Sequence, residues 1–237
     1  TLGCKLNFSE TSTISREFTK NGYEKVDFDK KYDIYIINTC SVTQNADKEF
    51  KYLVNKTKKN NPNAYVVAIG CYAQLKPKEI SSIDGVDLVL GADKKFDILN
   101  YLEFDKKISQ NYHSCQLSDV NKFKPSYSFG DRSRSFLKIQ DGCDYKCSYC
   151  TIPLARGKSR SPSIDNVTDS IKSLLDKGVK EVVLTGVNIG DFGIFDPKKP
   201  RQNNFLDLLN QINKIKDLKR LRISSIEPNL LNNDIID

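Results

Sequence analysis

Three cysteines, Cys143, Cys147 and Cys150, lie within eight residues in the segment DGCDYKCSYC. A structural zinc site usually has four protein ligands, but this segment offers three cysteines, and the only histidine of the chain is His113. A 4Fe-4S cluster held by three cysteines leaves one iron open for another ligand. The spacing therefore favours an iron–sulfur site with an open, reactive iron over a structural zinc site or a chance group of thiols.

Three further cysteines, Cys4, Cys40 and Cys71, are far apart in the sequence but share one structural position. They close the segments TLGC, INTC and AIGC, each at or just beyond the carboxyl end of a predicted parallel strand. Ligands of open parallel sheets bind outside these strand ends, so the three thiols are placed to converge. The alternative is three small buried core residues, although core cysteines are expected within strands rather than at their exits.

The cysteine count argues against a disulfide framework. Seven is an odd number, and the spacing is not that of a small secreted domain, so reduced thiols in a cytosolic protein are the better interpretation. The seventh cysteine, Cys115, lies near His113 in a segment without other candidate ligands, and we expect neither residue to bind a metal.

Alternating strands and helices must position the first cysteines. Apolar, β-branched runs predict strands at 33–38, 65–70 and 86–91, after an opening strand truncated before Thr1, and amphipathic segments predict helices at 9–21, 44–60, 77–82 and 94–102. Near-continuous apolar strands that alternate with helices are typical of a parallel sheet. We therefore predict an α/β, doubly wound parallel-sheet domain over residues 1–104.

A second domain must position the later cysteines. Residues 105–132 lose the periodicity and collect Ser, Asn, Pro and Gly, which predicts a linker. Beyond it, strands are expected at 135–140, EVVLTG and RLRISSIEP, with helices at 164–177, capped by Ser163 and ended by Gly178, and at 204–216. Three consecutive βα units predict a βα barrel over residues 133–237, incomplete at its carboxyl end.

The motif C-x3-C-x2-C, with Tyr149 before its last cysteine, resembles the signature of the radical S-adenosylmethionine (SAM) enzymes. The segments TLGCKLNFSET, INTCSVTQNAD, AIGCYAQ, LTGVNIGDFG and ISSIEP are similar to those of the methylthiotransferases, and this similarity runs throughout the chain. The resemblance implies SAM and two 4Fe-4S clusters as cofactors. It assigns Cys143, Cys147 and Cys150 to the cluster that binds SAM, and Cys4, Cys40 and Cys71 to an auxiliary cluster.

The resemblance also implies a reaction. Family members add a methylthio group to an unreactive carbon: one SAM supplies the methyl group to sulfur on the auxiliary cluster, and a second supplies the radical that abstracts hydrogen from the substrate. The segments NTCSVTQNAD and GVNIGDFG look most like the branch that acts at C2 of N6-threonylcarbamoyladenosine beside the tRNA anticodon. The alternatives are isopentenyladenosine in tRNA, an aspartate of a ribosomal protein, or a non-catalytic, metal-bearing RNA-binding module.

Other polar residues near the strand exits are candidate SAM contacts. Gly186 and Asn188 follow the second barrel strand, where a glycine-rich backbone could admit SAM, and Ser225 ends the third strand beside Ser224 and Glu227. Turn formation and strand-end capping are the alternative roles. Three cations after Cys150 could bind an RNA phosphate or the SAM carboxylate, or could be solvated loop residues: Arg156, Lys158 and Arg160.

The composition of the 237 residues, 38% hydrophobic and 28% charged, is that of a globular protein. The longest nearly apolar run, 65–73, is far shorter than the roughly 18 residues of a membrane span, so we predict no membrane association. The reduced cysteines favour a cytoplasmic protein, and we expect a monomer. The net charge of +7 is compatible with RNA binding and equally with plain solubility.

The resemblance adds expected partners: a tRNA substrate, a flavodoxin- or ferredoxin-like electron donor, and an RNA-binding domain after the barrel. The chain starts at Thr1 and contains no methionine, so we expect a further stretch before it.

Overall fold

The computed structural model describes residues 1–28, 30–40, 44–102, 112–114, 117, 120, 122–130, 133–195, 199–224 and 226–236. The chain divides into two compact units. Unit 1 comprises Thr1–Asn7 and Ile14–Val120, and unit 2 comprises Phe8–Thr13 and Asn121–Asp237. Helix α1 (Lys5–Lys20) therefore contributes its middle residues to unit 2 and its two ends to unit 1.

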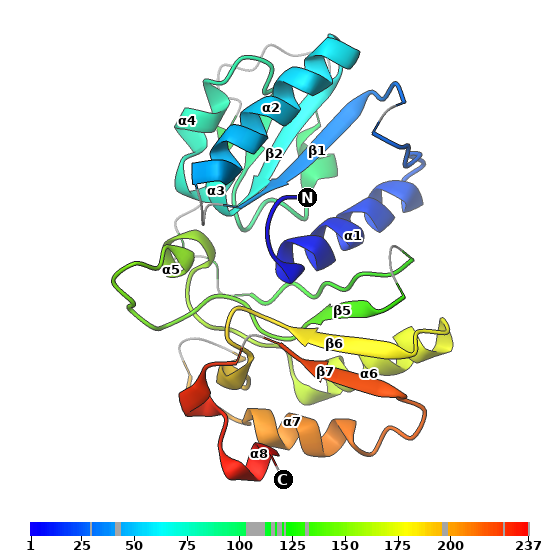
Figure 1. Cartoon of the computed structure of the whole chain (residues 1–237), viewed down its shortest axis with the longest axis vertical. Helices are drawn as coiled ribbons and strands as arrows, with labels where there is room; N and C mark the ends of the chain where they lie inside the picture. Colours follow the sequence, from blue (N-terminus) through cyan, green and yellow to red (C-terminus); the bar gives the residue numbers. More distant parts are fainter. Residues whose placement is uncertain are drawn as a thin grey trace. The chain divides into compact units, whose positions relative to one another are not determined.

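Unit 1 is built on a four-stranded parallel sheet in the order β1-β2-β3-β4, of which Figure 1 labels β1 and β2. Its strands are β1 (Ile34–Thr39), β2 (Tyr65–Gly70), β3 (Leu88–Leu90) and β4 (Tyr112–His113). The connecting helices are α2 (Gln44–Asn60), α3 (Cys71–Leu75), α4 (Pro77–Ser81) and the 3-10 turn η1 (Ile98–Tyr101).

Both faces of the sheet are buried at its centre, which explains why β2 and β3 are continuously apolar. Val66 and Ala68 of β2 pack in a core with Phe50 of α2 and with α3 and α4, whereas Val67 and Ile69 pack on the opposite face with Phe18 of α1. The predicted α/β fold with helices on both faces of a parallel sheet is confirmed.

Unit 2 holds a three-stranded parallel sheet in the order β5-β6-β7. Its strands are β5 (Ser135–Lys138), β6 (Glu181–Thr185) and β7 (Arg220–Ile223), and its helices are α5 (Ile152–Arg156), α6 (Ile164–Asp176), α7 (Phe205–Ile212) and α8 (Asn233–Ile236). Two 3-10 turns, η3 (Ile189–Asp191) and η4 (Pro228–Leu230), follow β6 and β7. The predicted run of βα units is confirmed.

Helix α6 shows how the sequence builds this unit. The Ser163 hydroxyl accepts a hydrogen bond from the Asn166 backbone N–H at 3.2 Å, and so caps the helix as predicted. Ile171 and Leu174 are fully buried against the sheet, and each contributes roughly 1.5–3 kcal/mol by leaving water. Gly178, at φ +84°, stops the helix because it can adopt a left-handed backbone.

Several predicted element boundaries are wrong. The expected helix 94–102 is only the turn η1, α1 begins four residues before the predicted 9–21, and α7 ends at Ile212 instead of residue 216. Thr1 and Leu2 lie outside any strand. The short elements α3, α5 and β4 were not predicted. The predicted domain boundaries at residues 104 and 132 stay a prediction.

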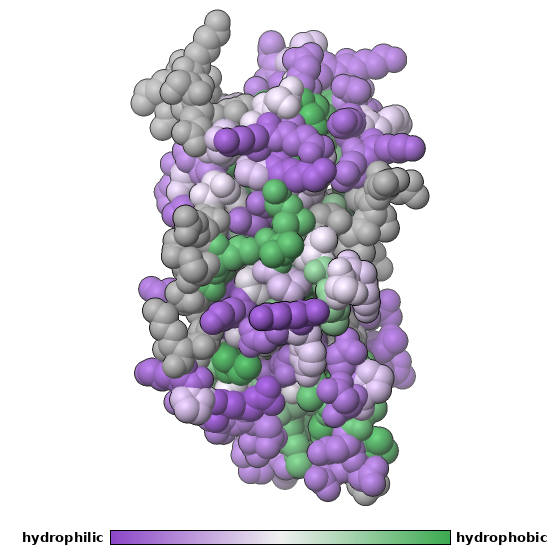
Figure 2. Space-filling view, turned by 90° about the vertical axis from the view of Figure 1, so that its left-hand side faces the viewer, coloured by the Kyte–Doolittle hydropathy of each residue, from purple (hydrophilic) through white to green (hydrophobic). Residues whose placement is uncertain are grey.

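The surface is mainly hydrophilic, with hydrophobic side chains gathered in a few patches on the face drawn in Figure 2. Within the described ranges, no helix combines the length and apolar character needed to cross a bilayer.

Candidate functional site: two sets of cysteines at strand exits

The sheet register of unit 1 brings Cys40 and Cys71 to neighbouring positions. Thr39 and Gly70, the last residues of β1 and β2, are paired across the parallel ladder, and each is followed directly by a cysteine. Cys40 is partly exposed and Cys71 is buried. Cys40 and Cys71, two of the three cysteines predicted to converge, thus follow adjacent strands at the same edge of the sheet.

The amino-terminal segment carries Cys4 to this edge. The Leu2 backbone N–H donates to the Asn38 carbonyl at 2.8 Å, and Asn7 Nδ2 donates to the carbonyls of Leu2 and Thr39, each at 2.9 Å. A Cβ at Gly3 would come within 2.8 Å of Cys40 Sγ, so the backbone just before Cys4 passes against the Cys40 side chain. Cys4 itself is exposed. The structure therefore gathers all three cysteines at one edge of unit 1.

Thr39 fixes the turn from β2 into the Cys71 helix. Its hydroxyl donates to the Ile69 carbonyl at 2.6 Å and accepts from the Ala73 N–H at 3.3 Å, so it holds the first turn of α3 against the end of β1. Gly70 sits at φ +99°, and a Cβ there would collide with the Thr39 backbone. Only glycine allows this close approach, which aligns the two strand ends.

The cysteine loop of unit 2 is closed at its base by backbone hydrogen bonds. Asp141 and Arg160 form an antiparallel bridge with two N–H to carbonyl bonds of 2.9 Å, and the Cys143 N–H donates to the Gly157 carbonyl at 3.0 Å. Gly142, at φ +71°, lies so close to the Lys158 carbonyl that no Cβ would fit. The three cysteines are therefore displayed by a loop whose two ends are held together.

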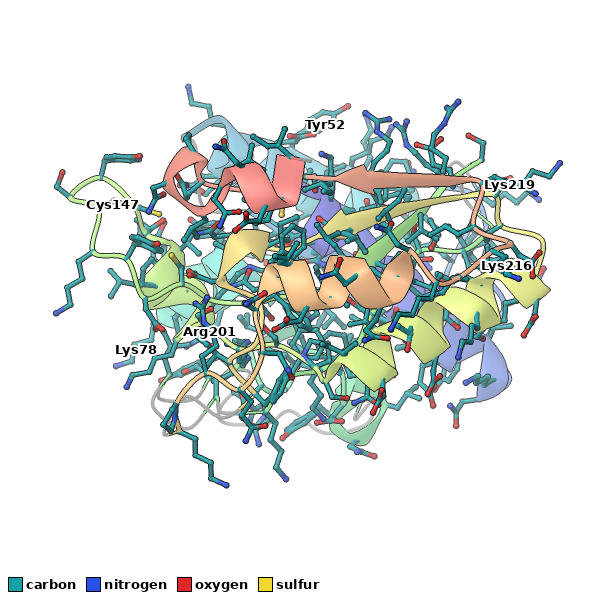
Figure 3. All side chains as sticks on the ribbon, turned by 90° about the horizontal axis from the view of Figure 1, so that it is seen from below. Tyr52, Lys78, Cys147, Arg201, Lys216 and Lys219 are labelled. Carbon is teal, nitrogen blue, oxygen red and sulfur yellow. The ribbon has the colours of Figure 1, made fainter. Side chains whose placement is uncertain are left out.

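Within this loop the thiols differ in exposure. Cys147 is exposed, while Cys143 and Cys150 are partly buried, and the Cys150 N–H donates to the Cys147 carbonyl at 3.1 Å. Burial raises the pKa of the Cys143 thiol. Figure 3 shows Cys147 on a loop at one end of unit 2, with Lys216 and Lys219 at the other end.

The chemistry of both sets suits an iron–sulfur cluster better than a single ion. In the part of the chain that is described, no three His, Cys, Asp or Glu groups converge on one metal position. A lone zinc ion needs all its sulfur ligands at about 2.3 Å, whereas a cluster spreads its thiolates over several irons. Two sets of three cysteines match that wider requirement in the type and number of their ligands.

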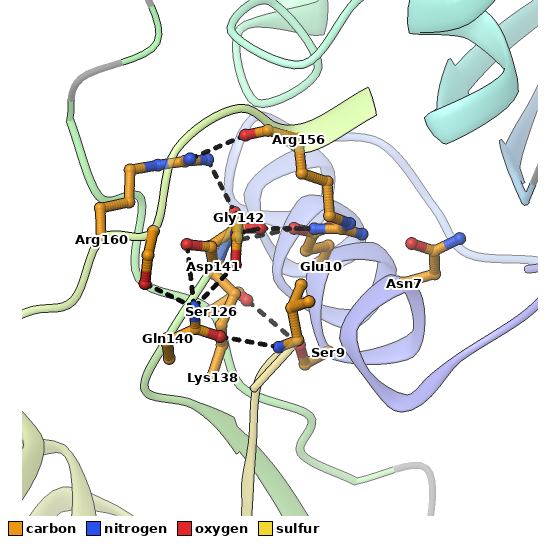
Figure 4. A network of polar contacts seen from close by, with 12 residues as sticks. Asn7, Ser9, Glu10, Ser126, Lys138, Gln140, Asp141, Gly142, Arg156 and Arg160 are labelled. Atoms are coloured by element: carbon orange, nitrogen blue, oxygen red, sulfur yellow. Dashed lines mark hydrogen bonds and ion pairs between the residues drawn. The ribbon is translucent and has the colours of Figure 1, made fainter. Parts of the chain in front are cut away.

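A network of buried charges lies beneath the cysteine loop (Figure 4). Arg156 Nη1 lies 2.9 Å from Asp141 Oδ1, and Arg160 Nη2 lies 3.0 Å from Asp141 Oδ2. Lys138 Nζ is 3.3 Å from Asp141 Oδ2 and 3.1 Å from Glu10 Oε1. Each of these side chains is at most 5% exposed, so their mutual contacts have replaced water.

This network corrects the sequence-based interpretation of the cations after Cys150. Arg156 and Arg160 are neither solvated nor turned outward toward a phosphate, because both are buried against carboxylates. Lys158 is the exposed member of the three.

The predicted SAM-contact residues are engaged in internal packing. Asn188, 2% exposed, donates from Nδ2 to Asp191 Oδ2 at 3.3 Å and accepts at Oδ1 from the Glu227 N–H at 3.2 Å. Gly186 passes Gln140 so closely that a Cβ would lie 2.9 Å from its Oε1. Ser225 lies outside the described residues, so its predicted role stays a prediction.

Other polar groups of the same loops also make internal hydrogen bonds and ion pairs. The Ser224 hydroxyl donates to the Leu184 carbonyl at 2.9 Å. This bond is the strand-end cap that the sequence analysis gave as the alternative to a SAM contact. Burial raises the pKa of the Asp191 carboxyl, against the opposing effect of Arg201 at 3.2 Å.

Sequence reasoning missed Gln140, a fully buried residue two positions after β5. Its carboxamide contacts both the cysteine loop and the loop after β6. The only sequence signal was a polar residue at the end of the predicted strand 135–140, directly before the motif DGC.

Two protein families match the chain. Residues 1–91 match the family described as "Uncharacterized protein family UPF0004", and residues 137–235 match the radical SAM superfamily. The first match contains Cys4, Cys40 and Cys71, and the second contains Cys143, Cys147 and Cys150.

Curated relatives match over the full length of the chain. Threonylcarbamoyladenosine tRNA methylthiotransferase MtaB of Bacillus subtilis is 37% identical over 100% of this chain and 52% of its own length, and its counterpart in Aquifex aeolicus is 36% identical over 95% and 55%. The chain thus spans about half the length of the curated relatives it matches.

Among solved structures, the radical S-adenosylmethionine methyltransferase TsrM from Kitasatospora setae, with cobalamin and a 4Fe-4S cluster bound, superposes with a TM-score of 0.56. The match covers 95% of this chain and 54% of that one, at 13% sequence identity. This similarity confirms the fold.

Proposed function

Because the chain belongs to the methylthiotransferase family that joins a UPF0004 domain to a radical SAM domain, we propose that it is part of a radical SAM tRNA methylthiotransferase. The proposed reaction is methylthiolation at C2 of N6-threonylcarbamoyladenosine, the modified base in the names of the MtaB relatives. The proposed partners are tRNA and a small electron-transfer protein, and the proposed location is the cytoplasm.

The observation that carries this proposal is the pairing of Thr39 with Gly70, because Cys40 and Cys71 directly follow these two residues, which supports their assignment to one cluster. We assign one 4Fe-4S cluster to these two residues and Cys4, and another to Cys143, Cys147 and Cys150. A radical SAM enzyme that only generates a radical needs the second set alone. A separate triad at strand exits in unit 1 is what sulfur insertion requires in addition.

The chain supplies position and shape, and the cofactors supply the difficult step. When bound, SAM and a reduced cluster would provide a radical strong enough to attack an unreactive C–H bond, which no side chain can do. The closed base of the cysteine loop would orient the second cluster, and the loop around Gly186 and Asn188 would border the SAM position. We propose that Ser225 also borders the SAM position. We further propose that residues 1–104 and 133–237 are two domains joined by a linker.

Iron counting tests the two-cluster assignment. Anaerobically reconstituted full-length protein should hold about eight irons per chain, and replacing either triad with alanine should remove about four. Only the loss of Cys143, Cys147 and Cys150 should abolish formation of 5'-deoxyadenosine from SAM. Cys115→Ala is the matched control and should change neither value. A wild-type content of about four irons would remove the auxiliary cluster from the proposal.

The substrate needs a separate experiment. Mass spectrometry of tRNA nucleosides from a strain that lacks the gene should show threonylcarbamoyladenosine without its methylthio group. Unchanged tRNA nucleosides would redirect the proposal to a protein substrate. Bound iron without any 5'-deoxyadenosine would instead support a non-catalytic RNA-binding module.

A further inference from the structure

The Gln140 side chain joins two loops that leave neighbouring strands of unit 2. Its Nε2 donates to the Gly142 carbonyl at 2.7 Å and to Ser159 Oγ at 2.9 Å, which are the two stems of the cysteine loop. Its Oε1 accepts from the backbone N–H groups of Val187 and Asn188, at 2.8 and 2.9 Å. One carboxamide therefore touches both ends of the cysteine loop and the start of the loop after β6.

The orientation of this amide is fixed by its partners. A carbonyl oxygen can only accept a hydrogen bond and a backbone N–H can only donate one, so a flipped amide would face like groups on both sides. Two N–H hydrogens and two lone pairs are all used, and the residue is 0% exposed. The site therefore matches the donor and acceptor pattern of glutamine, and an isosteric group with a different pattern would lose hydrogen bonds there.

The lack of a side chain at Gly186 allows the close approach of Gln140. A side chain at this position would put its Cβ 2.9 Å from Gln140 Oε1 and 2.8 Å from Ile189 Cγ2. The bare backbone at residue 186 is therefore explained by the approach of Gln140.

We infer that Gln140 is a positioning residue that sets the separation between the cysteine loop and the Gly186–Asn188 loop, and thereby the fit of SAM between them. This inference rests on the proposed function. If the cluster sits on Cys143, Cys147 and Cys150 and SAM extends toward the loop after β6, both halves of the SAM site depend on this one amide. The cysteine loop keeps its own closure through the Asp141 and Arg160 bridge.

Gln140→Glu is the sharpest substitution, because it preserves shape and both acceptor contacts but places an oxygen against the Gly142 carbonyl. In the reconstituted full-length protein, iron content should stay at the wild-type value while the dissociation constant for SAM rises by about tenfold or more, as expected when a buried carbonyl faces an acceptor. The change that SAM causes in the electron paramagnetic resonance spectrum of the reduced cluster should weaken in parallel. Gln211→Glu, at an exposed position of α7, is the matched control and should leave both values unchanged.

A second variant, Ser159→Ala, removes one hydrogen-bond partner of Gln140 Nε2 and should raise the SAM dissociation constant by about two- to tenfold. SAM binding within twofold of wild type in Gln140→Glu would overturn the inference. So would loss of iron in Gln140→Glu combined with wild-type SAM binding in Ser159→Ala, since Gln140 would then serve only the fold of the loop. A wild-type protein that fails to bind SAM would overturn the proposed function itself.

Discussion

Glu10 accepts hydrogen bonds from both terminal nitrogens of Arg156, from Nη1 to Oε1 at 3.1 Å and from Nη2 to Oε2 at 3.3 Å, although 146 residues separate them in the chain. Both side chains are at most 3% exposed. A paired, two-pronged contact of this kind is the strongest geometry open to arginine and a carboxylate. Arg156 is therefore a structural residue of unit 2, held by a part of α1 that groups with that unit.

Neutralising Glu10 should be costly. Glu10→Gln leaves Lys138 and Arg156 buried with one carboxylate fewer, and we expect a loss of about 3–5 kcal/mol in the free energy of unfolding. Denaturant unfolding followed by circular dichroism measures it. Glu17→Gln on the same helix breaks only an exposed 3.8 Å pair with Lys20 and should cost less than about 0.5 kcal/mol. Equal effects of the two substitutions would contradict the buried network.

Gly142→Ala should disable the cysteine loop selectively. Its Cβ would collide with the Lys158 carbonyl, so the loop base must open, and iron content should fall by about four per chain. Gly178→Ala is the control, because Gly178 has a similar φ of +84° and open space around its Cα. Full iron content in Gly142→Ala would show that the closed base is not needed to hold a cluster.

Thr39→Val should weaken the cysteine edge of unit 1. The substitution keeps the side-chain shape but removes the hydroxyl that contacts Ile69 and Ala73, at a cost of about 1–3 kcal/mol. Thermal unfolding of this variant is compared with that of Thr19→Val, whose hydroxyl makes only an exposed bond within α1. If the two variants unfold alike, Thr39 does not fix the start of α3.

Lys158→Ala should weaken tRNA binding by electrostatics alone. Lys158 is exposed at the cysteine end of unit 2, and loss of one phosphate contact should reduce the slope of log affinity against log salt by about 1. Lys216→Ala, at the opposite end of the unit in Figure 3, is the control and should leave the slope unchanged. A larger change of the salt slope in Lys216→Ala than in Lys158→Ala would contradict the proposal, because it would place the RNA at the end of unit 2 opposite the cysteine loop.

The periodicity of the sequence was enough to predict the long elements. Helix α2 at 44–60 and strand β2 at 65–70 have the predicted bounds, because α2 is a long amphipathic segment and β2 is an uninterrupted apolar run. The strand exits at Cys40 and Cys71 followed from these elements. Two short helices, α3 and α5, were not predicted, because five residues show little periodicity; α4 has the same length and was predicted.

The buried polar residues could not be predicted in this way. Local sequence shows that Arg156 carries a charge but does not show that Glu10, far along the chain, supplies its counterion. The sequence likewise does not show that the Asn188 amide bonds to Asp191 and to the Glu227 backbone, and its predicted contact with SAM stays a prediction. Long-range pairing of polar groups depends on the assembled fold, which local patterns do not encode.

The chemistry of the Gln140 contact also determines how it responds to pH and to salt. Carboxylates and imidazoles change charge with pH, and interactions between ions weaken as salt is added. A primary amide has no proton to gain or lose in this range, and here it is fully buried. The spacing between the cysteine loop and the loop after β6 is thus held by a group that acidity cannot titrate and ionic strength cannot screen.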